Sequence, residues 1–562
     1  MKKFFLFLFL SLLLMDCKPP EYADLILING NIYTMDSLRP QVQALGVRNG
    51  IISYVGRNEK ALKFKGDNTI VVDLGGKLMT PGLIEGHGHF MGLGYSQLTI
   101  DLSNTTSYDE IIKMVCKSVE KAEPGEWIIG RGWHQSKWDL LPVEMYQGFP
   151  THIELSEISP NNPVVLRHAS GHALLANAKA MEIAEIDMET SAINGGEVVK
   201  DNAGNPTGVF IESAMGLVSR FIPPNDKNTD KKAYKKAVNN CLKEGITSFH
   251  DAGADIETIS LYQDMIREDS LFIRLYVMLN GSDASLLDHY FSSGPQIDTI
   301  EHRLTVRAVK LYMDGALGSW GAWLFEPYDD RPDHTGHAVS TIESIRLVCN
   351  NAIENGFQVC THAIGDRANR EVLDIYESVF DSHPDSQNSR FRIEHAQHLS
   401  KKDIPRFAEL GVIPAVQSIH LSSDRPWAID RLGKERIDEG AYVWQKLLLS
   451  GARIVNGTDV PVEPLSFINC FYASITRKTL NGLPPSGYEP EQRMTREQAL
   501  KSYTIDAAYG AFEERIKGSI EVGKIADFTV YSRNIMTIPE EEILDTTILM
   551  TIIGGKIVYQ SN

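Results

Sequence analysis

Strand-like apolar runs alternate with helix-like segments through much of this 562-residue chain. Residues 345–353 carry apolar side chains at helical spacing, Gly356 ends the pattern, and the strand-like run 357–361 follows. The same order recurs at 407–416 and at 447–456. Strands that alternate with helices pair in parallel, because a parallel crossover needs roughly a helix's length of chain. At this length the alternation predicts an α/β fold with a (β/α)8 TIM-like barrel over residues 81–514.

Short strand-like runs gather at both ends of the chain, at 23–30, 32–35, 42–47, 51–55, 69–73, 528–531, 548–553 and 556–559. Asn29-Gly30 and Asn49-Gly50 lie between such runs and are typical of hairpin turns. We expect 21–80 and 515–562 to form one small β-sandwich domain. The stretch of about 100–240 is too long for one crossover, which predicts an inserted subdomain over the barrel mouth.

The first residues have the character of an export signal. Lys2 and Lys3 are followed by the almost wholly apolar run 4–15, which is too short for a stable membrane span. Cys17 lies where a bacterial lipoprotein is cleaved and acylated, so 1–17 resembles a lipoprotein-type signal, although Asp16 replaces the usual small residue. We expect an exported protein anchored by lipid on Cys17. The alternative is an ordinary signal peptide and a soluble secreted or periplasmic protein.

The overall charge narrows the classes of partner. The formal net charge is −18, whereas general nucleic-acid binding needs a basic face that neutralises phosphates. The cysteines after Cys17 are scattered without a CxxC pair, which favours isolated thiols over a disulfide framework. A small-molecule partner is therefore expected, and the oligomeric state is left open.

Histidines and a carboxylate follow several predicted strands. His87 and His89 are two residues apart, so on a strand they share a face and suit zinc or a similar divalent metal. Alone they have an alternative interpretation as unrelated loop histidines. His362, His395 and Asp459 each come directly after a predicted parallel strand. Because the carboxyl ends of barrel strands meet at one mouth, these residues predict a shared metal site.

Lys310 closes the strand-like run 304–310 and belongs to the same set. An ammonium group repels cations, but a desolvated lysine near metal charge has a lowered pKa. Its neutral amine is then able to take up carbon dioxide, and the resulting carbamate is an anionic ligand that bridges two metals. The alternative is an ordinary charged lysine that contacts substrate or a carboxylate.

The chain resembles the metal-dependent amidohydrolase superfamily, and in particular its amidohydrolase 3-type branch with N-substituted formamide deformylases and exported members. The resemblance covers nearly the whole chain after the signal. Its motifs are TPGLIEGHGH (80–89), VKLYMDGALG (309–318), THAIGD (361–366), RIEHA (392–396), GTDVPVEP (457–464) and GSIEVGKIAD (518–527). One departure is Trp320, where this branch often has arginine, and it bears on the substrate pocket.

The resemblance implies that His87, His89 and Asp459 hold one metal. A carboxylated Lys310 would bridge to a second metal on His362 and His395, giving two zinc ions per chain. Such a site hydrolyses carbon–nitrogen bonds of non-peptide, N-acyl or cyclic amides through a metal-activated hydroxide, with Asp459 as the catalytic proton carrier. Two alternatives remain: a mononuclear deaminase on the same fold, against which Lys310 argues, and a non-catalytic exported binding protein.

Further residues are candidates for the barrel mouth. Contact with substrate is expected for a set of polar side chains that follow predicted strands or lie in the insertion: His172, His250, Gln417 and His420. Asp366 is interpreted either as a carboxylate that orients His362 or as a helix N-terminal residue. The tryptophans of the insertion either line an apolar pocket or pack in a core: Trp127, Trp133 and Trp138.

Overall fold

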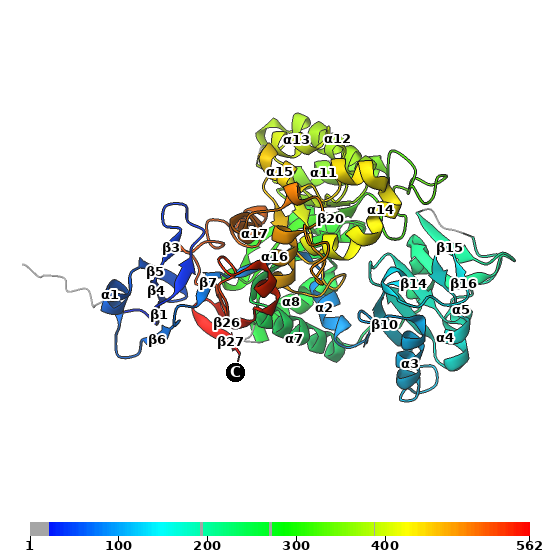
Figure 1. The fold of residues 1–562 in the computed structure, drawn as a ribbon, viewed down its shortest axis with the longest axis horizontal. Helices are drawn as coiled ribbons and strands as arrows, with labels where there is room; N and C mark the ends of the chain where they lie inside the picture. Colours follow the sequence, from blue (N-terminus) through cyan, green and yellow to red (C-terminus); the bar gives the residue numbers. More distant parts are fainter. Residues whose placement is uncertain (1–21, 192–194, 269–271, 387, 562) are drawn as a thin grey trace, which may run out of the picture.

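Eight parallel strands form the centre of the computed structural model, which describes residues 22–191, 195–268, 272–386 and 388–561 (Figure 1). The predicted signal and Cys17 lie outside the described residues. Each strand pairs in parallel with its neighbour. In spatial order they are β24 (Val455–Asn456), β23 (Ile413–Val416), β22 (Arg392–His395), β21 (Gln358–Ala363), β20 (Leu304–Tyr312), β18 (Arg274–Asn280), β17 (Ile246–Ala254) and β8 (Leu83–Gly88). A short strand, β19 (Gln296–Asp298), pairs antiparallel with β20.

The two outer strands of this row, β24 and β8, lie side by side, so the barrel is nearly closed. The backbone N–H of Asp459 donates to the carbonyl of His87 at 2.9 Å. A Cβ on Gly86 would lie 2.5 Å from the carbonyl oxygen of Asn456, so only glycine permits this approach. The predicted α/β barrel is therefore confirmed.

A helix precedes each barrel strand from β17 to β24. In chain order these helices are α7 (Lys227–Lys243), α8 (Ile256–Glu268), α9 (Ala284–Ser293), α11 (Ile342–Glu354), α12 (Asp366–Ser382), α13 (Ile404–Glu409) and α15 (Trp444–Ser450). Local sequence fixes where they begin. The Asp226 side chain accepts from the N–H of Thr229 at the start of α7, and Thr341 accepts from Ser344 at the start of α11. Further helices of the barrel unit include α2 (Phe90–Ser96), α14 (Ser418–Gly440), α16 (Phe467–Thr476), α17 (Arg496–Ser502) and α18 (Ile505–Gly510).

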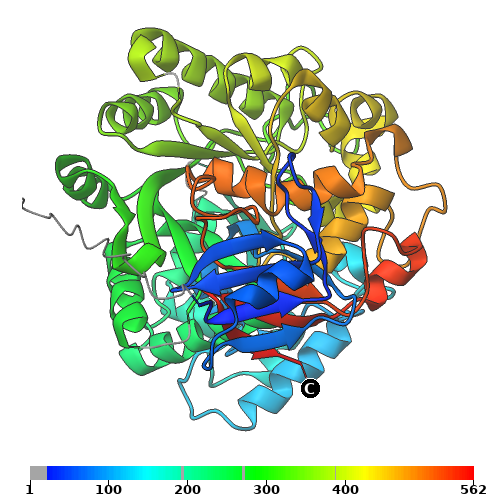
Figure 2. The same cartoon turned by 90° about the vertical axis from the view of Figure 1, so that its left-hand side faces the viewer.

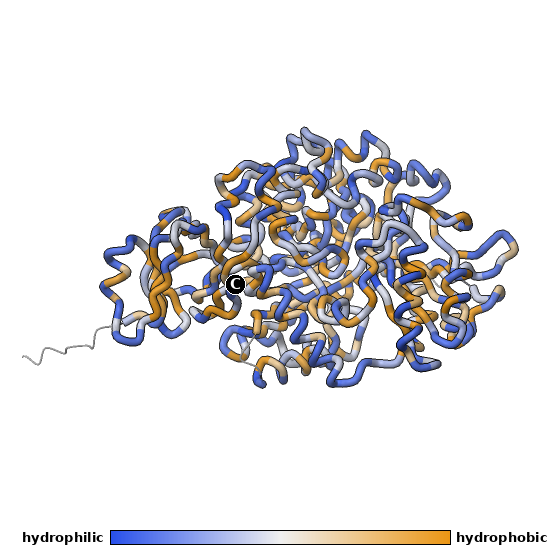
Figure 3. Tube along the Cα trace, turned by 60° about the horizontal axis from the view of Figure 1, so that its bottom comes forward, coloured by the Kyte–Doolittle hydropathy of each residue, from blue (hydrophilic) through white to orange (hydrophobic). Residues whose placement is uncertain are grey.

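Strands from both chain ends form two facing sheets beside the barrel (Figure 2). One contains β5 (Ile51–Gly56), β4 (Ala44–Arg48), β1 (Leu25–Ile28) and β6 (Ile70–Asp73). The other contains β27 (Lys556–Gln560), β26 (Ile548–Ile553), β25 (Phe528–Tyr531), β7 (Leu78–Pro81), β2 (Asn31–Tyr33) and β3 (Gln41–Val42). One apolar core joins them, with Leu25 and Leu45 from the first sheet and Phe528 and Ile552 from the second. Figure 3 shows hydrophobic segments of the chain gathered in this unit.

The two Asn-Gly pairs have different outcomes. Asn49 and Gly50 have φ of 51° and 75° and join β4 to β5 in an antiparallel hairpin, as predicted. The hairpin expected at Asn29-Gly30 is wrong, because β1 pairs with β4 and β6 whereas β2 lies in the other sheet. Asn29 alone has a positive φ, 55°, so the backbone there turns the chain from one sheet into the other.

A separate six-stranded sheet is inserted between β8 and α7, on the opposite side of the barrel from the sandwich (Figure 1). Its order is β15 (Gly196–Lys200), β16 (Pro206–Glu212), β14 (Ala173–Ala176), β13 (Val164–His168), β10 (Ile128–Trp133) and β9 (Ile100–Asp101). The helices of this insertion include α3 (Tyr108–Val119), α4 (Ile153–Ile158) and α5 (Ala178–Ile183). Trp133 and Trp138 pack in its core. No helix of the described residues has an apolar run long enough to cross a membrane.

Candidate metal centre

All six predicted metal ligands lie at the carboxyl ends of barrel strands. His87, Lys310, His362 and His395 belong to β8, β20, β21 and β22 respectively, while His89 directly follows β8 and Asp459 follows β24. Two of the six have an unusual backbone: φ is 76° at His395 and 58° at Asp459. Left-handed backbone at non-glycine residues is strained, and such strain clusters at functional sites, where it aims a side chain.

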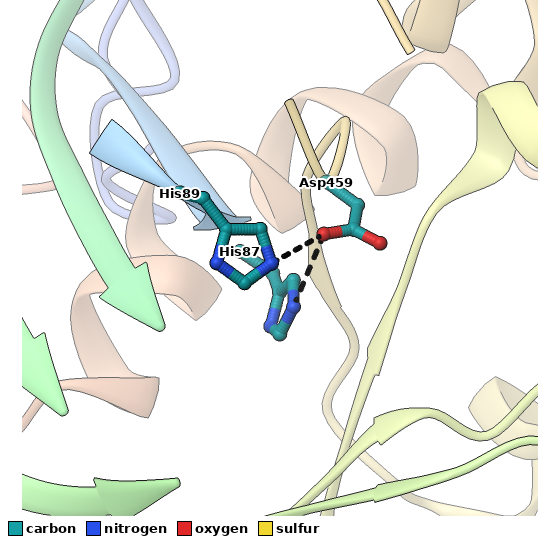
Figure 4. Close-up of side chains that lie close together, drawn as sticks. All are labelled: His87, His89 and Asp459. Carbon is teal, nitrogen blue, oxygen red and sulfur yellow. Dashed lines mark ion pairs between the residues drawn. The ribbon is translucent and has the colours of Figure 1, made fainter. Parts of the chain in front are cut away.

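His87, His89 and Asp459 form the closest group (Figure 4). Asp459 Oδ1 lies 3.5 Å from His87 Nε2 and 3.3 Å from His89 Nε2. Within the part of the chain that the structure describes, this is the one set of three ligand atoms that all lie within 4.8 Å of one another. Two imidazoles and one carboxylate are a donor set that suits zinc.

The other three residues adjoin this group. Lys310 Nζ lies 3.4 Å from His87 Nε2. The ring centroids of His362 and His395 are 4.4 Å apart, and those of His87 and His395 are 5.1 Å apart. The structure therefore brings all six predicted residues together at one point of the barrel mouth.

The charge state of these groups suits metal binding. Burial lowers the pKa of His362 and of His395 well below the ordinary value, which keeps both imidazoles neutral with a free lone pair. Burial alone would raise the pKa of Asp459, but the neighbouring His87 and His89 outweigh it and hold that pKa well below its usual range. His362 Nε2 and Asp459 Oδ1 are buried without a hydrogen-bond partner among the described residues. Buried nitrogen and oxygen atoms that lack hydrogen-bond partners and belong to one site are available as ligands of a metal.

A buried ion pair orients His87. Its Nδ1 faces Glu394 Oε2, and Glu394 also accepts hydrogen bonds from Arg392 Nε at 2.7 Å and Nη2 at 2.8 Å. Arg392 Nη2 further donates to the Gly86 carbonyl at 2.7 Å. Burial would raise the pKa of Glu394, but Arg392 and His87 lower it below the ordinary value. A carboxylate on the far nitrogen of a metal-ligating histidine fixes its tautomer and leaves Nε2 free for the metal.

Two cavities meet at this centre. One, of about 570 Å³, is lined by apolar side chains such as Leu317, Ile364 and Trp427 together with polar and charged ones. The other, of about 1230 Å³, is lined by polar groups that include Arg131, Ser213 and Tyr312. Both cavities reach a shared set of residues: Ser170, His172, His362, His395, Asp459 and Val462. A small molecule that occupies both would therefore pass directly over the centre.

Comparison with known proteins identifies the family. Residues 70–559 match the amidohydrolase family. The chain belongs to this family. It is 33% identical to Protein LONG AFTER FAR-RED 3 of Arabidopsis thaliana, over 96% of this chain and 92% of that protein. It is 26% identical to the N-substituted formamide deformylase of Arthrobacter pascens, over 96% of this chain and 99% of that protein.

A solved structure of a relative agrees with the fold of this amidohydrolase. An uncharacterized metal-dependent hydrolase from Pyrococcus horikoshii superposes with a TM-score of 0.73 at 26% identity, over 92% of this chain and 99% of that chain. The recognition of the family from sequence motifs is confirmed, together with a metal-dependent hydrolase as the general class of its relatives.

The four predicted substrate contacts of the amidohydrolase separate into two pairs. His172 and His420 line the 570 Å³ cavity. Gln417 lies behind the centre, where its Oε1 is 2.7 Å from His395 Nδ1, a position that orients His395. His250 lies in the barrel interior, 3.1 Å from Arg392 Nη1 and packed against Tyr276.

Several carboxylates near the centre were not assigned a role from the sequence. Asp314 accepts from the N–H groups of Trp323, Ile364 and Gly365, and burial raises its pKa to about 7. Its Oδ1 is 3.6 Å from His362 Nε2, whereas Asp366 begins α12 and accepts from a backbone N–H instead. Glu394 lies two residues after Arg392, so strand alternation placed both on one face. That alternation was the signal available for Glu394.

Proposed function

We propose that this amidohydrolase hydrolyses carbon–nitrogen bonds of small non-peptide, N-acyl or cyclic amides, using two divalent metals, zinc being the expected one. The observation that supports it is the convergence of six residues from five barrel strands, or the loops directly after them, on the junction of two cavities. The relative named N-substituted formamide deformylase acts, by its name, on bonds of this kind.

His87, His89 and Asp459 would hold one metal, and His362, His395 and Lys310 the other. When bound, such metals supply Lewis acidity and lower the pKa of water. Asp459 is anionic, and its Oδ1 faces the two imidazoles while Oδ2 points away from them (Figure 4). In this proposal Oδ2 receives the proton of the attacking water and passes it to the leaving amine.

The surroundings of Lys310 support a carbamate. Lys310 is 1% exposed, and no carboxylate of a described residue lies within 4.0 Å of its Nζ. An ammonium group buried without a carboxylate costs far more free energy than a buried neutral amine. Attack of the amine on carbon dioxide forms an N–C bond, releases a proton and leaves an anionic oxygen ligand. For its location, we propose export with lipid attached to Cys17, which rests on the sequence of residues 1–17.

Metal content and activity test the proposed function together. We expect about two metals per chain in purified mature protein, and hydrolysis in a screen of N-formyl, N-acyl and cyclic amides. One metal per chain would support the deaminase, and none would support the binding protein. Asp459→Asn is expected to lose turnover while it retains much of the metal. The control is Asp506→Asn on α18, which removes a partly buried carboxylate outside both cavities. Full activity in Asp459→Asn would contradict the proton-carrier role.

A further inference from the structure

Two arginines stand side by side on the inserted sheet, next to the metal centre. Arg131 on β10 and Arg167 on β13 are partners in the parallel register, so their side chains leave the same face of the sheet. Arg131 lines the 1230 Å³ cavity together with His89, Lys310 and Asp459. Like charges directly opposite each other on neighbouring strands destabilise a sheet, so a negative charge beside these two arginines would be stabilising.

Neither arginine has a carboxylate partner among the described residues. Arg131 Nε and Nη2 each donate at 3.2 Å to a backbone carbonyl, of Pro461 and Ala169 respectively. Its Nη1 makes no hydrogen bond with a described residue. This nitrogen lies 4.0 Å from the position that a Cβ on Gly171 would take, and Gly171 also lines the cavity. No hydrogen bond or ion pair of the Arg167 side chain is formed within the described part of the chain.

The nearby carboxylates are already engaged elsewhere. Asp101 is in register with Arg131 on β9, but its Oδ1 accepts from the backbone and side chain of Ser103, and it forms no ion pair with Arg131. Glu212 lines the same cavity; its Oε2 pairs with His172 Nδ1 at 2.8 Å, while its Oε1 has no hydrogen-bond partner among the described residues and forms no ion pair with either arginine. Asp314 also lines this cavity and accepts from three backbone N–H groups. Asp459 belongs to the proposed metal site. Burial lowers the pKa of Arg131 to about 10, although the charge of Asp459 acts against this shift, and burial lowers the pKa of Arg167 as well.

We propose that Arg131, reinforced by the charge of Arg167, binds a carboxylate of the substrate, so that the enzyme acts on anionic amides. This inference rests on the proposed function, because it places the anion on one side of the bond that is cleaved. Arginine suits the role because its planar guanidinium binds a carboxylate through two parallel N–H donors. Hydroxyl groups of Ser213, Ser340 and Tyr312 line the same cavity and complete a polar wall.

The second cavity defines the other half of the substrate. Its apolar wall beyond the centre is formed by Ala316, Leu317, Ile364, Trp427 and Val462, while Lys137, Asp424 and Glu463 line another part of the same cavity. Such a wall favours an apolar group through burial of hydrocarbon surface. A molecule that satisfies both cavities has a carboxylate on one side of its amide and an apolar group on the other. N-acylated apolar amino acids are the simplest compounds of this class.

A matched pair of ligands tests the anion subsite directly. N-acetylleucine and its primary amide differ mainly in one negative charge, and calorimetric titration gives their dissociation constants on the metal-loaded Asp459→Asn protein, in which turnover is stopped. We expect the carboxylate to bind about 10- to 100-fold more tightly than the neutral amide, as for one charge-assisted interaction. The same ratio is measured in Arg167→Gln, which loses no hydrogen bond to a described residue, and in Arg131→Gln.

Each arginine variant should weaken binding of the carboxylate about tenfold or more, and change binding of the neutral amide less than about threefold. Arg131→Lys should recover part of the loss. Arg220→Gln is the control, because it removes an exposed arginine of the same insertion that lines neither cavity. Equal binding of both ligands would overturn the proposal, as would equal weakening of both by the variants. A charge preference that survives both arginine variants would place the carboxylate on the metals instead and also overturn it.

Activity separates this inference from the proposed function on which it rests. If the wild-type protein hydrolyses neutral amides without any preference for anionic ones, the proposed hydrolase activity is supported and the anion subsite is contradicted. If no amide is hydrolysed but binding of the carboxylate depends on Arg131 and Arg167, the anion subsite is supported and the proposed hydrolase activity is contradicted.

Discussion

At the scale of single residues, Glu394 links a fully buried cation to the metal centre. Arg392 is 0% exposed, and Glu394 is the carboxylate that neutralises it while also facing His87. Removing one partner of a buried ion pair leaves an uncompensated charge, which costs far more than the net contribution of the pair. Glu394 therefore acts both on stability and on the orientation of a ligand.

Replacing Glu394 separates these two effects. Glu394→Gln should lower the free energy of unfolding by about 3–5 kcal/mol and the metal affinity roughly 10- to 100-fold, measured by urea unfolding and chelator competition. Glu514→Gln is the matched control. It removes one partner of the Arg390–Glu514 ion pair, whose N···O distance is 2.9 Å and which lies outside the metal centre. The control should lose some stability but no metal affinity. Wild-type metal affinity in Glu394→Gln would show that Glu394 does not position His87.

The sequence predicted which residues gather at the site, because each of the six lies near the carboxyl end of a barrel strand or shortly after it. It did not predict roles that depend on pairing between distant segments. His172 was singled out, but its partner Glu212 lies 40 residues later on another strand of the insertion. Gln417 was placed at the substrate, yet it contacts His395, 22 residues away. Strand periodicity fixes the face of a side chain but not its partner.

At the scale of elements, hydrogen bonds to Glu85 connect β8 with the segment that follows β24. Its Oε1 accepts hydrogen bonds from the backbone N–H and, at 3.1 Å, from the hydroxyl of Thr458. The Thr458 hydroxyl also accepts from the N–H of Val460 at 3.2 Å. Since His87 and Asp459 are carried by these two segments, this contact sets the spacing of the closest ligand group.

Thr458→Val removes the hydroxyl with little change of shape. We expect a loss of about 1–3 kcal/mol in the free energy of unfolding, because a buried carboxylate oxygen and a backbone N–H each lose a partner. Metal titration should show weaker binding as well. Thr458→Ser keeps the hydroxyl and should lie close to wild type in both measurements. If the valine variant unfolds at the wild-type urea concentration, the contact does not hold the two segments.

Elements were predictable where local chemistry decides them. The type of turn at Asn49-Gly50 follows from two adjacent residues that adopt positive φ at low cost. The path of the chain at Asn29-Gly30 depends instead on which of the two sheets the next strand joins. That choice is decided by pairing with distant strands, which the local sequence does not encode. The internal order of the inserted sheet was likewise beyond the sequence, because β9, β10 and β13 pair in parallel across long connections.

At the scale of the whole molecule, one buried ion pair joins the barrel to the sandwich. Arg274 begins β18, and its Nε and Nη2 contact Asp527 oxygens at 2.6 and 3.0 Å. Asp527 leads into β25 and also accepts from the N–H of Gly554 at 2.8 Å. Both side chains are almost fully buried, 5% and 4% exposed. The pair lies at the start of β18, at the opposite end of the barrel strands from the metal centre.

Breaking this pair should affect the joining of the two units and leave the metal centre unchanged. Asp527→Asn leaves Arg274 buried without a counter-charge, so we expect about 3–5 kcal/mol less stability and a lower thermal midpoint. Metal content per folded chain should stay at the wild-type value, because all six ligands belong to the barrel. Asp545→Asn tests the same change in the exposed Arg533–Asp545 pair at 3.9 Å, where screening by water limits the cost to about 1 kcal/mol or less. Loss of metal in Asp527→Asn at a temperature where it is folded would mean that docking of the sandwich shapes the centre from across the barrel.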